Sequence, residues 1–259
     1  MRTILFSIII FLSVSVVAQK KSPFEKFGDI NTSDLNKKTY NLDTSADAVV
    51  LSDIGNVSII GVDGWFSLVT KRHTVIHILK KKGYDLANVK LSLYKEGDDE
   101  ERVKSLRGVT YNLENGKLVS TKLEKSGQFK EKLDKNSQLL KFTLPKVKEG
   151  SIIEYDYELT SPFITVPDSW YFQRLDAPVL WSEYSFGSPG FFGYHFFPRG
   201  YQPFFINEVP DGYMIDDLPK SFRINYDKAG GASFDYLISE SENIISFRGT
   251  LKINKTNFP

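Results

Sequence analysis

Hydrophobic and polar residues alternate along much of the chain, which is the pattern of β-strands with one buried face. The clearest case is the segment 152–159. Apolar and acidic residues take turns along it, in the order Ile153, Glu154, Tyr155, Asp156, Tyr157, Glu158 and Leu159. Because side chains on a strand alternate between the two faces of a sheet, the apolar residues share one face and the acidic residues the other. We predict a strand here, with its acidic face exposed to water.

Further strands are predicted where Val, Ile, Thr and aromatic residues cluster between turn signals. Asn115 and Gly116 separate two such segments and predict a hairpin, because both central residues of this turn need a positive φ. The strand predicted at 49–60 is expected to be broken at 54–56, where a glycine occurs. The other predicted strands are 69–79, 107–114, 117–123, 138–144, 170–175, 179–186, 222–226 and 244–253.

Helical signals are weak by comparison. The segment 22–36 suits one short helix, and Thr32, Ser33 and Asp34 are residue types that cap helices. Neither signal is continued by a period of 3.6 residues. Many short strands separated by turn residues predict a mainly β chain with little helix, folded as one or two antiparallel β-sandwiches.

The first residues are typical of a secretory signal peptide. Arg2 provides a positive start, an apolar run covers 4–17, and small residues precede Gln19. This run is shorter than the roughly 20 residues that span a membrane, so no stable membrane anchor is expected. We predict export to the periplasm or the extracellular space. The predicted division is a signal peptide at 1–18, a lead-in segment at 19–45 and a β-sandwich domain at 46–259.

Composition excludes several classes of function. With 33 basic and 32 acidic residues, the chain has no excess of positive charge that would favour nucleic acid. The sequence contains no cysteine, so a thiol nucleophile, a cysteine metal site and a disulfide are all excluded within these residues. No glycine-rich loop opens a predicted helix, which argues against a nucleotide cofactor. We expect no cofactor and no enzymatic activity of the chain itself.

Two arrangements of polar residues are candidate sites. His73 and His77 would share a strand face about 13 Å apart, too far for one metal ion whose ligands lie about 2 Å away. They are predicted to be surface or rim histidines, with no metal site. A glycosidase would need two carboxylates facing each other across a cleft, roughly 5–9.5 Å apart. Glu154 and Asp156 are neighbours along one strand, so a solvated sheet face is favoured.

The segment 186–205 is unusually rich in aromatic residues among Gly and Pro. Exposed, these rings would stack on sugars or peptides; folded back, they would complete the core or contact another domain. The second interpretation is favoured because so apolar an exposed patch promotes aggregation. The candidate ligand or interdomain contacts are Phe191, Phe192, Tyr194, Phe196, Phe197 and Tyr201.

Several motifs occur in a fixed order over nearly all of the chain that follows the predicted signal peptide. They are ADAVVL at 46–51, KRH at 71–73, IHILKKKGYD at 76–85, TYNLENGK at 110–117, LPKVKEGSIIEY at 144–155, SPF at 161–163, WYFQ at 170–173, Pro178 and SEY at 182–184. Together they resemble an uncharacterised N-terminal β-sandwich domain that precedes transglutaminase-like domains in exported bacterial proteins. The resemblance implies an immunoglobulin-like β-sandwich and a transglutaminase-like partner domain in the same parent chain.

Asn257, Phe258 and Pro259 resemble the start of the junction that leads into the catalytic domain of such proteins. The resemblance implies that a papain-like domain with Cys, His and Asp follows, so we expect this chain to be truncated before it. The expected function is that of a non-catalytic exported module that scaffolds, or presents substrate to, this transglutaminase-like or cysteine-peptidase-like domain. The alternative is a stand-alone glycan- or peptide-binding module that uses the aromatic segment.

Overall fold

The structure is a computed structural model. It describes residues 23–62, 65–165, 167–189, 192, 206–208 and 244–251. The predicted signal peptide at 1–18, the strand predicted at 222–226 and the junction motif at 257–259 lie outside these residues. Within the described residues, no helix is long and apolar enough to cross a membrane.

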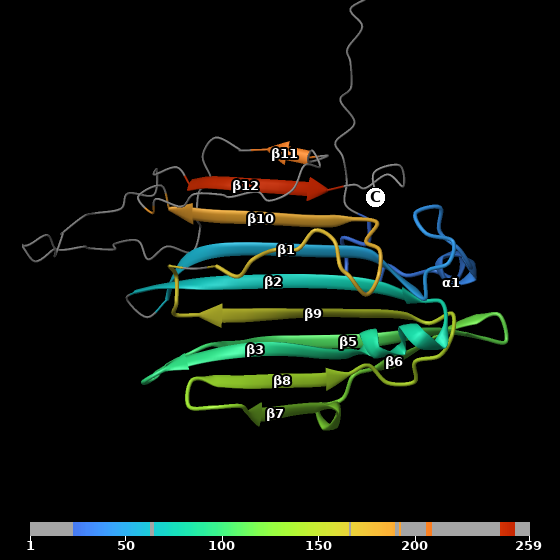
Figure 1. The fold of residues 1–259 in the computed structure, drawn as a ribbon, viewed down its shortest axis with the longest axis horizontal. Coiled ribbons are helices and arrows are strands. Elements are labelled where there is room, and N and C mark those ends of the chain that lie inside the picture. Colours follow the sequence, from blue (N-terminus) through green and yellow to red (C-terminus); the bar gives the residue numbers. More distant parts are fainter. Residues whose placement is uncertain are drawn as a thin grey trace, which may run out of the picture.

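A large eight-stranded sheet forms the body of the protein, in the order β11-β12-β10-β1-β2-β9-β5-β6 (Figure 1). All neighbours in this sheet are antiparallel except β1 and β10, which run parallel. The strands are β1 (Ala48–Val62), β2 (Trp65–Ile78), β5 (Arg102–Glu114), β6 (Lys117–Lys122), β9 (Ile152–Ser161), β10 (Ser182–Pro189), β11 (Ile206–Glu208) and β12 (Ile244–Leu251).

A second, antiparallel sheet has four strands in the order β4-β3-β8-β7. These are β3 (Asn88–Glu96), β4 (Asp99–Glu100), β7 (Gln128–Lys132) and β8 (Ser137–Thr143). The helices of the described residues are short: α1 (Thr32–Asn36), η1 (Lys81–Ala87) and η2 (Lys125–Gly127). The prediction of a mainly β, sandwich-like fold with little helix is confirmed.

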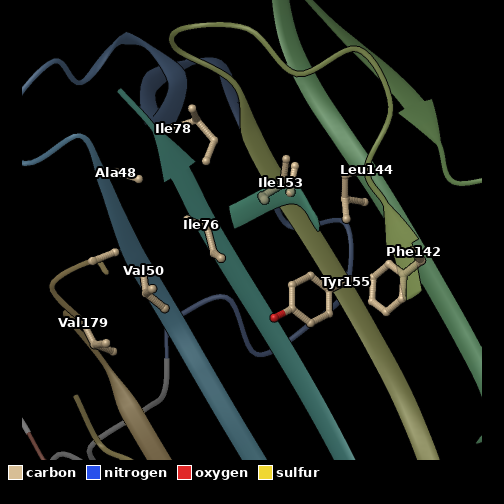
Figure 2. Close-up of a cluster of buried hydrophobic side chains, with 11 residues drawn as sticks. Ala48, Val50, Ile76, Ile78, Phe142, Leu144, Ile153, Tyr155 and Val179 are labelled. Carbon is tan, nitrogen blue, oxygen red and sulfur yellow. The ribbon is translucent and has the colours of Figure 1, made fainter. Parts of the chain in front are cut away.

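The main core lies between the two sheets (Figure 2). Every second residue of the central strands turns toward the small sheet, including Ile76 of β2 and Ile153 of β9. They meet Phe142 of β8, whose ring packs edge-on against Tyr155 with 5.6 Å between ring centroids. The apolar face predicted for 152–159 is therefore confirmed, and its burial supplies much of the driving force for pairing the sheets.

The N-terminal segment 23–47 covers the opposite face of the large sheet. Ile30, Leu35 and Tyr40 pack there against Val75 and Ile152. The short helix α1 begins after a capping box in which Asn31 accepts from Ser33 N–H and Asp34 accepts from Asn31 N–H. The cap lies one residue before the residues that the sequence suggested. At this end, the central strands are buried on both faces.

β1 continues without a break through 54–56, contrary to the prediction. Gly55 pairs with Arg72 of β2 and Tyr184 of β10. The glycine is needed because the ring of Trp170 lies on it: a Cβ at this position would meet Trp170 Cζ3 at 2.5 Å. The strand predicted at 170–175 is also wrong, since this segment is a loop that packs over the sheet.

The hairpin turn is confirmed between β5 and β6. Asn115 and Gly116 have φ values of 50° and 75°. Four strands were not predicted: β3, β4, β7 and β11. In β3 the apolar residues Val89, Leu91 and Leu93 do alternate with polar residues, so a local signal was present there. β7 is largely exposed and has a single apolar residue, so no alternation marks it.

His77 is fully buried in β2, where it was predicted to lie at the surface or rim. Its Nδ1 lies 2.8 Å from the hydroxyl of Tyr40, so the N-terminal segment shields it. Burial, assisted by the nearby Lys38 ammonium, lowers the pKa of His77 to about 4. The imidazole therefore stays neutral in the folded protein at neutral pH.

Replacing Gly55 with alanine should destabilise the fold by about 1–3 kcal/mol, because the added methyl group meets the Trp170 ring. Urea unfolding of the purified chain measures the change. In a Trp170→Leu background the same substitution should be less costly, with a coupling free energy of about 1 kcal/mol. Equal costs in both backgrounds would contradict this account of Gly55.

Acid should destabilise the protein through His77. The unfolded-state pKa of a histidine is about 6.5 and the folded value is about 4, so unfolding takes up a proton between these values. The stability that neutral His77 contributes is complete above about pH 6.5 and falls by about 3 kcal/mol as the pH drops to about 4. Urea unfolding across this range should show a smaller loss in His77→Gln. An NMR titration of the wild-type ring gives an independent test, and protonation near pH 6.5 would refute the assignment.

Candidate functional site

Glu154 of β9 is the centre of a polar cluster on the face covered by the N-terminal segment. The sequence predicted an exposed acidic face here, but the Glu154 side chain is 0% exposed. The prediction is wrong at this residue because segment 23–47 lies over this end of the sheet. Farther along β9, Asp156 and Glu158 remain partly exposed, as expected.

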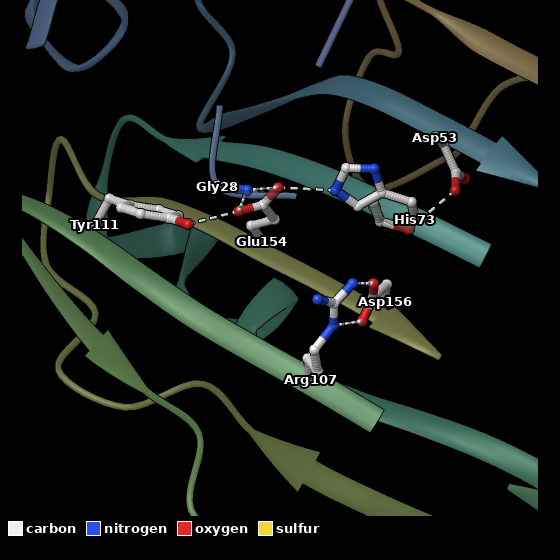
Figure 3. Close-up of polar contacts among 8 residues, drawn as sticks. Gly28, Asp53, His73, Arg107, Tyr111, Glu154 and Asp156 are labelled. Carbon is white, nitrogen blue, oxygen red and sulfur yellow. Dashed lines mark hydrogen bonds and ion pairs between the residues drawn. The ribbon is translucent and has the colours of Figure 1, made fainter. Parts of the chain in front are cut away.

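Three donors from distant parts of the chain meet the Glu154 carboxylate (Figure 3). The backbone N–H of Gly28 lies 3.0 Å from both oxygens. Nε2 of His73 lies 2.8 Å from Oε1, and the hydroxyl of Tyr111 donates to Oε2 at 2.6 Å. Burial, together with this hydrogen bond, raises the pKa of Tyr111, which keeps its phenol protonated as the donor. A buried carboxylate requires such partners, and here it has them.

The order of the strands brings these groups together. β9 lies between β2, which carries His73, and β5, which carries Tyr111. Phe27 directly precedes Gly28 and packs beside His73, with 5.8 Å between ring centroids. The guanidinium of Arg107 also packs on Phe27, 4.3 Å from the centre of its ring. This cluster of Gly28, His73, Tyr111 and Glu154 is the Glu154 clamp, because it holds the N-terminal segment against the sheet.

Arg107 also pairs with Asp156 on the neighbouring strand β9. Its Nε donates to Oδ1 at 2.9 Å and its Nη2 donates to Oδ2. These hydrogen bonds raise the pKa of Arg107, against a smaller opposing effect of burial. Because the side chain of Arg107 is 61% exposed, solvent weakens the pair, whose contribution to stability is about 1 kcal/mol or less.

A shallow depression of about 280 Å³ lies beside this clamp. It crosses β1, β2, β9 and β5 on the same sheet face, beyond the part that the N-terminal segment covers. Its polar lining includes Asn56, Lys71, Arg107, Asp156 and Glu158. This site was not predicted from the sequence, because its residues come from four separate strands. The two-residue period of a strand shows which residues of that strand share a face. It does not show which strands are neighbours, so these residues are seen to share one face only when the strand pairing is known.

A second buried carboxylate lies on the opposite face of the sheet. Asp53 of β1 accepts from Nε and Nη2 of Arg72 at 2.8 and 2.6 Å, and from the hydroxyl of Thr74 at 3.0 Å. The guanidinium of Arg72 lies 4.7 Å from the ring centre of Trp170. Trp170 Nε1 in turn donates to Ser182 at 3.1 Å. This network holds the loop 162–181 over the sheet and was not found from the sequence.

Of the six aromatic candidates, Phe192 lies within the described residues. Its ring packs edge-on against Phe66 of β2, with 5.0 Å between centroids, in a cluster that includes Tyr184. This contact fits the core interpretation of the aromatic segment for this residue. The other five candidates lie outside the described residues: Phe191, Tyr194, Phe196, Phe197 and Tyr201.

The two strand histidines do not converge on one site. His73 contacts Glu154 and His77 contacts Tyr40, so each has a separate protein partner. In the part of the chain that the structure describes, no three His, Asp or Glu side chains are arranged to hold a metal ion.

Replacing Glu154 with glutamine should loosen the N-terminal segment. The amide keeps the shape of the side chain but removes the charge that three donors share, so we expect a loss of about 2 kcal/mol. Urea unfolding measures this loss, and hydrogen exchange should show faster exchange of the Gly28 amide. Glu158→Gln, on the same strand and face, is the matched control and should change stability by about 0.5 kcal/mol or less. Equal effects of the two substitutions would contradict the clamp.

Comparison with known proteins places the chain in a family. No curated protein matches it in sequence. Similar solved structures include a protein assigned provisionally as a protease from Parabacteroides distasonis, with 10% identity and a TM-score of 0.48. Yeast LTA4 hydrolase in complex with bestatin has 11% identity and a TM-score of 0.30. The alignments cover 80% of this chain in both cases, but only 36% and 29% of those proteins.

TM-scores below 0.5 indicate neither a shared overall fold nor a shared activity. The sequence match to a family is more extensive. A family described as a domain of unknown function with a solved structure, DUF3857, matches residues 66–203, just over half of the chain. This range includes β2, β5 and β9, the strands that carry His73, Tyr111 and Glu154. The chain belongs to the DUF3857 family.

Proposed function

We propose that the chain is a non-catalytic exported module that scaffolds, or presents substrate to, a transglutaminase-like or cysteine-peptidase-like domain of the same parent protein. The observation that carries this proposal is the use of its acid–base groups. Glu154 and His73 are the residues best suited to proton transfer on this face, but they contact each other, and Glu154 accepts from the chain's own backbone at Gly28.

A general acid or base must come within hydrogen-bonding distance of the substrate atom that it serves. The oxygens of Glu154 are covered by protein and already accept from Gly28 and Tyr111. Asp53 on the opposite face is likewise 1% exposed and paired with Arg72. Both carboxylates therefore stabilise the contacts between the sheet and its covering segments, as in a rigid support.

Two further observations support the proposal. The chain belongs to a family of domains of unknown function, and its motifs resemble domains that precede transglutaminase-like domains. Its first residues are typical of a signal peptide, which fits an exported parent protein. The alternative is a stand-alone glycan- or peptide-binding module that uses the aromatic segment. It is less favoured at Phe192, which packs against Phe66 rather than projecting into solvent.

The test begins by identifying the domain with Cys, His and Asp that is encoded in the same or the adjacent reading frame. This domain is then assayed with and without the purified chain, using a polypeptide substrate and a small amide substrate. Because a presenting module binds the polypeptide substrate and brings it to the catalytic domain, kcat/KM for the polypeptide should rise by about tenfold or more. The value for the small amide should stay unchanged.

Two results would refute the proposal. One is hydrolysis or acyl transfer by the chain alone that is lost in Glu154→Gln or His73→Ala, which would make the chain an enzyme. The other is the same kcat/KM with and without the chain for both substrates. Binding of a soluble oligosaccharide with no effect on catalysis would support the alternative module instead.

A further inference from the structure

The polar depression is built from two rows of side chains that cross the large sheet. The register places Asn56 opposite Lys71, Lys71 opposite Glu158, and Glu158 opposite Ser105. The four strands therefore place these side chains in one row, with about 4.8 Å between neighbouring strands. The next row along the sheet contains His73, Asp156 and Arg107. Both rows lie on the face that carries the Glu154 clamp.

The first row offers hydrogen-bond donors that the fold leaves available. Lys71 Nζ lies 3.7 Å from Glu158, beyond hydrogen-bond distance, and its side chain is 65% exposed. Asn56 lines the depression and accepts from the Ser185 hydroxyl through Oδ1, so the donors that it can offer a ligand are its amide N–H groups. An ammonium and an amide on adjacent strands match the two oxygens of a carboxylate.

The central strand of the depression offers the complementary groups. Asp156 and Glu158 of β9 are partly exposed carboxylates, which accept hydrogen bonds from N–H donors. Arg107 donates to both oxygens of Asp156, whose side chain nevertheless remains 22% exposed. The depression thus presents donors at β1 and β2 and acceptors at β9, an order that suits a ligand with a carboxylate followed by N–H groups.

We propose that this depression binds the carboxylate end of a short peptide, with the carboxylate on Lys71 and Asn56 and the peptide N–H groups toward Asp156 and Glu158. The inference rests on the proposed function, since it names the substrate class that the module presents. Crossing from β1 to β5 spans about 14 Å, which an extended peptide of about four residues covers. Charged residues make up most of the lining, which also includes Tyr157, and their charges suit the ionic end of a peptide.

The probe is N-acetyl tetra-alanine with a free carboxylate, compared with the same peptide ending in a carboxamide. Calorimetric titration of the full chain should show about tenfold tighter binding of the free acid. Lys71→Met keeps the length of the side chain without the charge, so it should bind the acid and the amide equally. Lys90→Met, on the exposed side of the small sheet, is the matched control and should keep the preference for the acid.

Several outcomes would overturn the inference. These are failure of the free acid to bind, equal binding of acid and amide by the wild type, and an unchanged preference in Lys71→Met. Binding of chitotetraose in place of the peptide would assign the depression to a glycan. Because Lys71→Met should weaken binding of the free acid to the level of the amide, it should also reduce the increase in kcat/KM for the polypeptide substrate. If the chain still raises kcat/KM but binds no peptide here, the proposed function stands and this site is wrong.

Discussion

The buried carboxylate of Glu154 is the interaction on which the arrangement of this sheet face depends. A carboxylate removed from water is strongly destabilising unless several donors replace its hydration. Here one of the donors is the backbone of Gly28, which lies 126 positions away in the chain. The requirement to satisfy Glu154 therefore fixes where the N-terminal segment crosses the sheet. That crossing in turn buries His77 against Tyr40 and sets its low pKa.

On each face of the large sheet, a buried carboxylate holds a covering segment of the chain. Glu154 holds the N-terminal segment on one face, while Asp53 and Arg72 hold the loop that carries Trp170 on the other. The small sheet covers the rest of the second face with an apolar core. On the first face, the polar depression lies open beside the Glu154 cluster among the residues that the structure describes. The proposed module would use the first part of this face as a support and the second as an accessible polar surface.

Local sequence patterns determined much of the fold. The alternation along 152–159 predicted a strand and its buried side, and Asn115 with Gly116 predicted the hairpin, because these features depend on neighbouring residues. The mainly β class and the placement of His73 and His77 on one strand also came from local spacing. Each of these inferences needs only the two-residue period of a strand or the φ preference of a turn.

Only the tertiary structure decided the rest. The same alternation that marked β9 suggested that Glu154 was exposed, because a period of two separates the faces without saying what covers them. Gly55 predicted a break in the strand, but the strand continues, and the missing side chain of Gly55 makes room for the ring of Trp170 from a later loop. Lys71 and Asn56 became one candidate site only when β1 and β2 were paired. Contacts between residues far apart in the chain arise from strand order and packing, and no local pattern encodes them.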